Sequence, residues 1–225
     1  MIAELNTKNV VGLTKLSFLK IILYLSFLVS IVYSCQPKKS STPFSSSRNA
    51  FIPNTAKNLS EKQWDSVQNT SNKILPHPKS KRNTNNKILG WHIYSNGTSY
   101  KNYNFKLLWG ISYFSYVINP LTGVSKNKHH WKTTALIDSA KVHGCKVFLS
   151  VSNFGAKSNS LFLNNTKAQE TLIDNLVELL DYRKADGINI DFEGVAKKDK
   201  KLFTSFINRI SKKLKKVNPK YLVTL

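Results

Sequence analysis

The chain has 225 residues, with 34 Lys and Arg against 12 Asp and Glu, and a formal net charge of +22. Two cysteines exclude a disulfide-rich scaffold, and no pair of histidines has the spacing of a metal site, so we expect neither a metal nor another cofactor. The basic residues are spread along the chain without interleaved aromatic residues, so we expect no nucleic-acid partner. The positive charge indicates either lysines on solvated helix faces or affinity for anionic lipid headgroups or acidic wall polymers.

Residues 1–35 have the pattern of a lipoprotein signal peptide. Three lysines precede the apolar run 21–32, as in the charged and apolar regions of a secretory signal. The run ends in the letters VYSC, which resemble a bacterial lipobox, so Cys35 is expected to be lipidated and to anchor the chain in a membrane. We therefore predict a place in the bacterial cell envelope, at the outer membrane or cell surface. An ordinary signal peptide and a single membrane anchor are alternatives, although the run is short for a membrane span.

Residues 36–86 are rich in Ser, Asn, Lys, Thr and Pro and have few periodic apolar residues. Such a composition buries too little surface to fold, and it predicts a flexible polar linker. A short helix is expected around residues 59–67. Because lipidation of Cys35 would leave Cys145 without a cysteine partner, we expect Cys145 to be a small buried apolar residue.

From residue 87 onward, strand and helix patterns alternate. Helices are indicated by apolar residues that recur every three to four positions, and strands by short apolar or alternating runs. The alternation predicts a parallel sheet with helices on its faces. In chain order we expect strands at 87–92 and 108–117, a helix at 131–143, a strand at 145–152, a helix at 167–184, a strand at 186–193, a helix at 199–217 and a strand at 221–225.

The octet at 186–193 reads DGINIDFE and carries the strongest functional signal of the chain. In a strand, every second side chain points to the same face, so Asn189, Asp191 and Glu193 share one face. Carboxylates on a covered strand are costly to bury unless they face a solvated cavity, as at the carboxyl end of a barrel strand. We interpret Asp191 and Glu193 as a catalytic pair. A solvated edge strand, a helix-capping acid pair and a metal or ligand site are the alternatives.

This octet resembles the DGxDxDxE signature of family 18 glycoside hydrolases, which include chitinases and chitinase-like lectins. KILGWH, LWGISYFSYVINPLTG and KVFLSVSNFG resemble the first three strands of that family, in the same order. Asn189 stands in place of the first Asp of the signature core, as in the branch related to spore-cortex-lytic N-acetylglucosaminidases.

The resemblance extends over residues 87–225 and implies an α/β fold, the (β/α)8 TIM barrel. About five strands are expected within the chain, whereas a whole barrel needs about 250 residues. We therefore expect residues 87–225 to be a partial barrel, truncated at its C-terminal side.

The resemblance also implies roles for individual residues. Glu193 matches the general acid of the family, and Asp191 matches the residue that positions the acetamido group of the sugar. We expect Asn189, Asn153, Tyr113 and Trp91 to bind the substrate, with core packing as the alternative for the two aromatic side chains.

The expected function is that of a surface-anchored, monomeric glycosidase. Its partner would be an N-acetylglucosamine-containing polysaccharide, namely chitin, peptidoglycan or the chitobiose of N-glycans. The resemblance implies substrate-assisted retaining catalysis, in which the 2-acetamido oxygen of the sugar is the nucleophile. The alternatives are a chitinase-like carbohydrate-binding lipoprotein without activity, and an inactive gene fragment.

Overall fold

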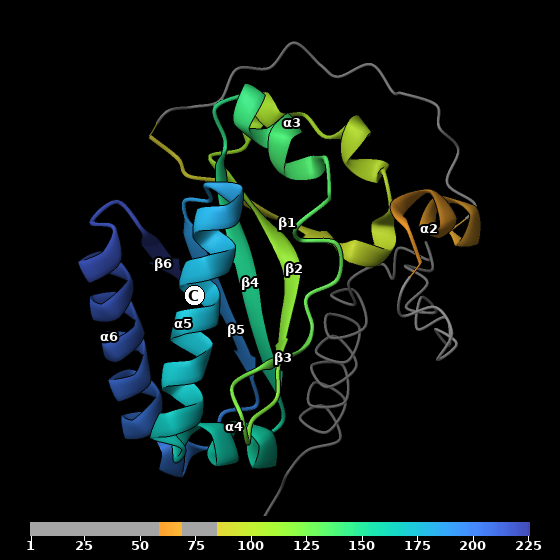
Figure 1. The fold of residues 1–225 in the computed structure, drawn as a ribbon. Helices are drawn as coiled ribbons and strands as arrows, with labels where there is room; N and C mark the ends of the chain where they lie inside the picture. The colour runs from red at the N-terminus through yellow and green to blue at the C-terminus, as the bar shows by residue number, and fades with distance from the viewer. Residues whose placement is uncertain (1–58, 69–84) are drawn as a thin grey trace, which may run out of the picture. The chain divides into compact units, whose positions relative to one another are not determined.

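The structure is a computed structural model that describes residues 59–68 and 85–225 (Figure 1). The predicted signal peptide, the lipidation site Cys35 and most of the predicted linker lie outside the described residues. No helix within the described ranges has the length and apolar character needed to cross a membrane.

A six-stranded sheet forms the centre of the described part, and five of its strands run parallel in the order β1-β2-β4-β5-β6. The short β3 (Ser125–Asn127) pairs antiparallel with β2. The parallel strands all lie where the sequence predicts them, which confirms the α/β class. Their bounds are Leu89–Ile93 (β1), Gly110–Ile118 (β2), Lys146–Phe154 (β4), Gly187–Glu193 (β5) and Leu222–Thr224 (β6).

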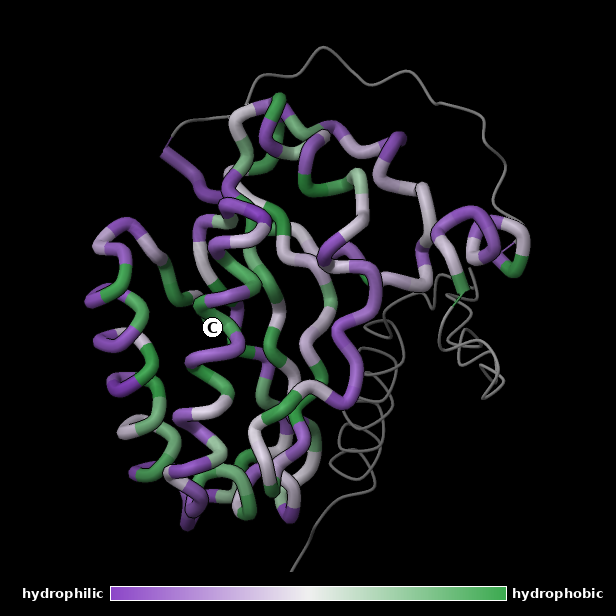
Figure 2. The backbone as a smooth tube through the Cα atoms, viewed as in Figure 1, coloured by the Kyte–Doolittle hydropathy of each residue, from purple (hydrophilic) through white to green (hydrophobic). Residues whose placement is uncertain are grey.

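Two long helices, α5 (Thr166–Arg183) and α6 (Lys200–Val217), lie on the same side of the sheet (Figure 1). Each buries one apolar stripe, as the helical spacing of its residues predicts. Figure 2 shows the outer side of α6 as hydrophilic and the side toward α5 as hydrophobic. The buried stripes include Leu172, Leu176 and Leu180 of α5 and Phe206, Ile210 and Leu214 of α6.

The helix predicted at 131–143 is shorter in the structure, where α3 spans Leu136–Val142. The carbonyl of His130 accepts the amides of residues 133 and 134 in a turn, and the Thr134 hydroxyl then accepts the amide of Leu136. Side-chain and turn hydrogen bonds therefore take up backbone groups that a longer helix would use. The buried Trp131 lies within this turn and donates its indole N–H to the carbonyl of Leu179.

Several elements were not predicted from the sequence. Helix α4 (Ala156–Leu163) starts directly after β4, at Gly155, whose φ of 90° favours glycine. The connection from β1 to β2 holds short 3₁₀ helices: η2 (Tyr94–Asn96), η3 (Ser99–Asn102) and η4 (Phe105–Leu107). A further one, η5 (Lys197–Asp199), precedes α6.

The short helix expected near residues 59–67 is present as α2 (Glu61–Val67). Ser60 and Gln63 form a capping box at its start, and Trp64 is buried against Tyr94 with the ring centroids 5.7 Å apart. The carboxylate of Asp65 accepts hydrogen bonds from the amide and hydroxyl of Thr98, at 2.7 and 2.6 Å. This part of the predicted linker is therefore folded onto the sheet domain.

The hydrophobic core lies between the sheet and its helices. On β5, Ile188 and Ile190 are buried in this core, and Phe192 stacks on Phe206 of α6 with centroids 5.6 Å apart. Cys145 is buried in the same core, as predicted. Because side chains alternate along a strand, the residues between these apolar positions of β5 project from the opposite face of the sheet.

Candidate active site

The acid pair lies at the carboxyl end of β5. Asp191 is half-buried opposite Ser152 of β4, and Glu193 is exposed opposite Phe154, the last residue of β4. Both project from the face of the sheet that points away from α5 and α6. Their position at the carboxyl end of a parallel strand is the one at which barrel enzymes place catalytic groups.

The backbone at Glu193 is fixed by the start of α4. Its carbonyl accepts hydrogen bonds from the amide of Gly155 at 2.9 Å and from the side-chain amide of Asn159 at 2.7 Å. Gly194 turns the chain immediately afterwards with a φ of 72°, and a Cβ there would lie 3.4 Å from the Cα of Gly155. Two glycine turns thus pack together and hold the last residue of the acidic strand in place.

Neither carboxylate of the pair has a hydrogen-bond or salt-bridge partner among the described residues. Burial and the nearby charge of Glu193 both raise the pKa of Asp191 above its ordinary value. In a chain of net charge +22, two neighbouring acids without a cationic partner are unusual. Both carboxyl groups are therefore available to a ligand, and a raised pKa such as that of Asp191 is common at functional sites.

Asn189 is held by a chain of hydrogen bonds across the sheet. The indole N–H of Trp91 on β1 donates to its Oδ1 at 2.8 Å, and its Nδ2 donates to the hydroxyl of Thr224 on β6 at 3.0 Å. Asn189 is only 2% exposed, so its hydrogen bonds stabilise the acidic strand within the sheet. Trp91 is 50% exposed on the same face. The structure therefore brings Asn189 and Trp91 together, and only Trp91 has an accessible surface for a ligand.

Tyr113 and Asn153 do not join this face. Tyr113 is 1% exposed and packs near Trp131, with its hydroxyl accepting the amide of His130. Asn153 is buried and accepts a hydrogen bond from the hydroxyl of Ser158 on α4 at 2.6 Å. The reason is the alternation of the strands, which turns both side chains to the helix side of the sheet. Their contact with substrate stays a prediction, and for Tyr113 the buried position agrees with the alternative of core packing.

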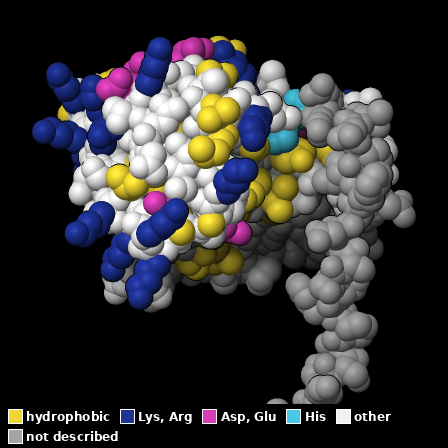
Figure 3. Space-filling view, turned by 90° about the horizontal axis from the view of Figure 1, so that it is seen from below, with side chains coloured by type: hydrophobic (Ala, Val, Ile, Leu, Met, Phe, Trp, Pro, Cys, Tyr) yellow, Lys and Arg dark blue, Asp and Glu magenta, His cyan; other side chains and the backbone are white. Residues whose placement is uncertain are grey.

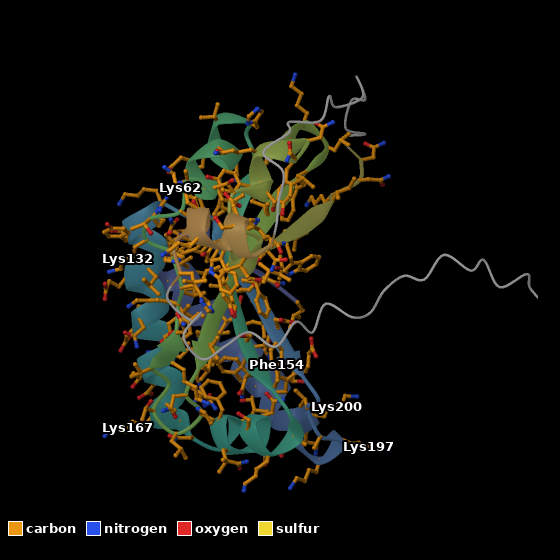
Figure 4. All side chains as sticks on the ribbon, turned by 90° about the vertical axis from the view of Figure 1, so that its right-hand side faces the viewer. Lys62, Lys132, Phe154, Lys167, Lys197 and Lys200 are labelled. Carbon is orange, nitrogen blue, oxygen red and sulfur yellow. The ribbon has the colours of Figure 1, made fainter. Side chains whose placement is uncertain are left out.

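Two phenylalanines extend the aromatic surface of the site. Phe114 of β2 and Phe154 of β4 stack with their ring centroids 6.2 Å apart, and Phe154 is 49% exposed next to Glu193. Figure 4 shows Phe154 on the face turned away from the helices, near the carboxyl ends of the strands. Phe154 shares the face of Asp191 because it lies two residues after Ser152, which pairs with Asp191. This pairing comes from the structure, so sequence reasoning missed Phe154.

Comparison with known families decides the identity of the fold. Residues 79–225 match the model of the family described as glycosyl hydrolases family 18. The chain belongs to this family. The family predicted from the acidic octet is therefore confirmed.

The similar proteins include members from sporulating bacteria. The putative sporulation-specific glycosylase YdhD of Bacillus subtilis is 33% identical over 66 residues, which cover 29% of this chain and 16% of that protein. The spore cortex-lytic enzyme SleL of Bacillus megaterium QM B1551 has a TM-score of 0.55 at 22% identity, over 66% of this chain and 35% of that one. A chitinase from Bacteroides thetaiotaomicron has a TM-score of 0.51 at 17% identity, over 64% of this chain and 46% of that one.

These likenesses confirm the predicted barrel fold, with five of its parallel strands in the described part. The chain spans less than half the length of each of these three relatives.

Proposed function

We propose that this site hydrolyses β-linked N-acetylglucosamine polymers. The observation that carries the proposal is the unpartnered pair Asp191 and Glu193 at the carboxyl end of β5 in a family 18 chain. The half-exposed rings of Trp91 and Phe154 on the same face support it, because sugar sites combine apolar surfaces with a few polar groups.

In the mechanism that we propose, Glu193 protonates the glycosidic oxygen and later removes a proton from the attacking water. The carbonyl oxygen of the 2-acetamido group attacks the anomeric carbon while the bond to the leaving sugar breaks. Water then attacks the same carbon while the bond to the acetamido oxygen breaks, which restores the acetamido group. Asp191 accepts a hydrogen bond from the acetamido N–H and stabilises the positive charge that develops on the ring. The hydrogen bonds from Gly155 and Asn159 to the carbonyl of Glu193 hold the acid in position for both proton transfers.

The test compares two fluorogenic disaccharides with the full chain. A chitobioside carries the 2-acetamido group, and a cellobioside carries a hydroxyl in its place. We expect turnover of the chitobioside alone, because the cellobioside lacks the nucleophile. Comparable turnover of the cellobioside would mean that the acetamido group is not the nucleophile, and would overturn the substrate-assisted mechanism. Binding of chitobiose by a folded chain without turnover would favour a carbohydrate-binding protein.

We further propose that the chain is a monomer anchored in the bacterial cell envelope by a lipid on Cys35. The apolar run before the VYSC letters supports the lipid anchor. Metabolic labelling with radioactive palmitate tests it, and the label should be absent from Cys35→Ala. Label that persists in this variant would overturn the assignment.

A further inference from the structure

A surface pocket lies next to the turn that follows the acidic strand. It is a pocket of about 420 Å³ between α4 and the loop that follows β5, lined by Lys157, Ser160, Leu161, Asn164 and Lys198, among others. Its α4 wall begins at Ala156, directly after Gly155, whose amide donates to the carbonyl of Glu193. The opposite wall begins three residues after Glu193. The pocket therefore adjoins the turn that carries the proposed acid.

The walls of this pocket are basic. Lys157 and Lys198 are exposed, and no Asp or Glu is among the lining residues. Neither lysine forms a salt bridge with any residue that the structure describes. Figure 4 shows Lys197 and Lys200 at the same end of the sheet as Phe154, and Figure 3 shows more Lys and Arg than Asp and Glu on this end of the molecule.

The chemistry of the walls indicates the kind of ligand that fits. Two unpaired ammonium groups attract an anion, and charge-assisted hydrogen bonds to a carboxylate are stronger than neutral ones. The hydroxyl of Ser160 and the apolar surface of Leu161, which is 43% exposed, suit an uncharged part of the same substituent. Chitin carries no anionic group, whereas peptidoglycan strands carry carboxylates on their lactyl and peptide substituents.

We propose that this pocket binds a carboxylate-bearing substituent of the polysaccharide whose sugar chain lies at Asp191 and Glu193. The inference rests on the proposed function and adds to it a site that selects an anionic wall polymer over chitin. Lys157 and Lys198 are its specificity-determining residues.

The test measures binding of the full chain to three particles: phosphate-free peptidoglycan sacculi, the same sacculi with their carboxylates converted to methylamides, and chitin. The variant is Lys157→Gln with Lys198→Gln. The matched control is Lys212→Gln with Lys213→Gln, which removes the same charge from exposed positions near the other end of α6. All four lysines are exposed, so both variants should fold.

We expect the pocket variant to bind untreated sacculi about three- to tenfold more weakly, the range for losing two partly exposed charge pairs. The loss should shrink with added salt, because ions screen exposed charges. Amidated sacculi and chitin should bind the pocket variant and the unmodified chain equally. The control should bind untreated sacculi as the unmodified chain does.

Equal losses of affinity for untreated sacculi in the pocket variant and the control would show attraction by net charge alone and would overturn the proposal. So would an unchanged affinity of the pocket variant, or an equal loss on amidated sacculi. Because these readouts are binding constants, they are independent of turnover. Carboxylate-dependent binding without hydrolysis would contradict only the proposed function, and hydrolysis without any effect of the two lysines would contradict only this inference.

Discussion

At the scale of single residues, the site combines two carboxylates, Asp191 and Glu193, with the uncharged side chain of Asn189. Asn189 uses Oδ1 toward Trp91 and Nδ2 toward Thr224, so its amide orientation is fixed by two other strands. The nearby charge that acts on Asp191 is that of Glu193. The sequence predicts that these three residues share one face. It does not reveal the bonds of Asn189, because its partners come from strands far away in the chain.

The raised pKa of Asp191 predicts how stability depends on pH. The folded state holds the proton of Asp191 more tightly than the unfolded state, whose pKa is near 3.8. Its carboxyl therefore favours folding at low pH, and this contribution is lost as the pH rises from 3.8 through the folded-state pKa. At pH 7 the ionised group is half-buried beside Glu193 and opposes folding.

Asp191→Asn should therefore raise the melting temperature at pH 7 by a few degrees at most, since the group is partly exposed. The gain should shrink when the pH is lowered through the folded-state pKa toward 3.8. Thermal unfolding followed by circular dichroism at several pH values measures this. Asp174→Asn, at an exposed position of α5, is the control and should cause no comparable change. A lower melting temperature of Asp191→Asn at pH 7 would contradict the assigned environment.

At the scale of elements, the regular strands and the two long helices were predictable. Their periodicity extends over many residues and agrees with the fold, as in 166–183 and 200–217. Helix α4 was not predicted, because it is short and its buried residues, such as Phe162 and Leu163, are too few to set a period. Tyr113 shows a different limit of sequence reasoning. The parity of its strand relative to Asp191 depends on the pairing register, which the structure supplies.

Substitutions of two glycines should show that the turn after β5 affects activity as well as stability. Gly194 and Gly144 have φ values of 72° and 71°, and any L-residue there is strained by about 1–2 kcal/mol. A Cβ at Gly144 would meet nothing within 4 Å, and at Gly194 it would make ordinary van der Waals contact with Gly155, whose Cα lies 3.4 Å away. Gly194→Ala and Gly144→Ala should therefore lose similar free energies of unfolding in urea.

Only Gly194→Ala should also lower turnover of a fluorogenic chitobioside. The strained φ at position 194 relaxes through the backbone next to Glu193, and a small shift of this side chain reduces catalysis, because proton transfer needs a fixed geometry. Equal turnover by the two variants would mean that this turn does not position the acid.

At the scale of the whole molecule, the acid pair lies within a strongly basic protein. The chain carries a net charge of +22, and residues 200–225 contain no acidic residue. Such a charge attracts anionic polymers over distances of about a Debye length, which is roughly 8 Å at physiological salt. Figure 3 shows where many of these cations lie, at the end of the sheet that also carries the site. The composition predicts the attraction, but only the fold brings Lys157 and Lys198 into one pocket next to the turn that follows β5.

The central claim is that Glu193 is the general acid of a glycosidase. The most direct measurement compares hydrolysis of a fluorogenic chitobioside by the full chain, by Glu193→Gln, and by Glu170→Gln, which makes the same chemical change at an exposed position of α5. We predict that Glu193→Gln loses about 10²- to 10⁴-fold in kcat, as expected when a general acid–base group is removed, and still binds chitobiose. Glu170→Gln should retain full activity. Turnover by Glu193→Gln at the rate of the unmodified chain would contradict the account.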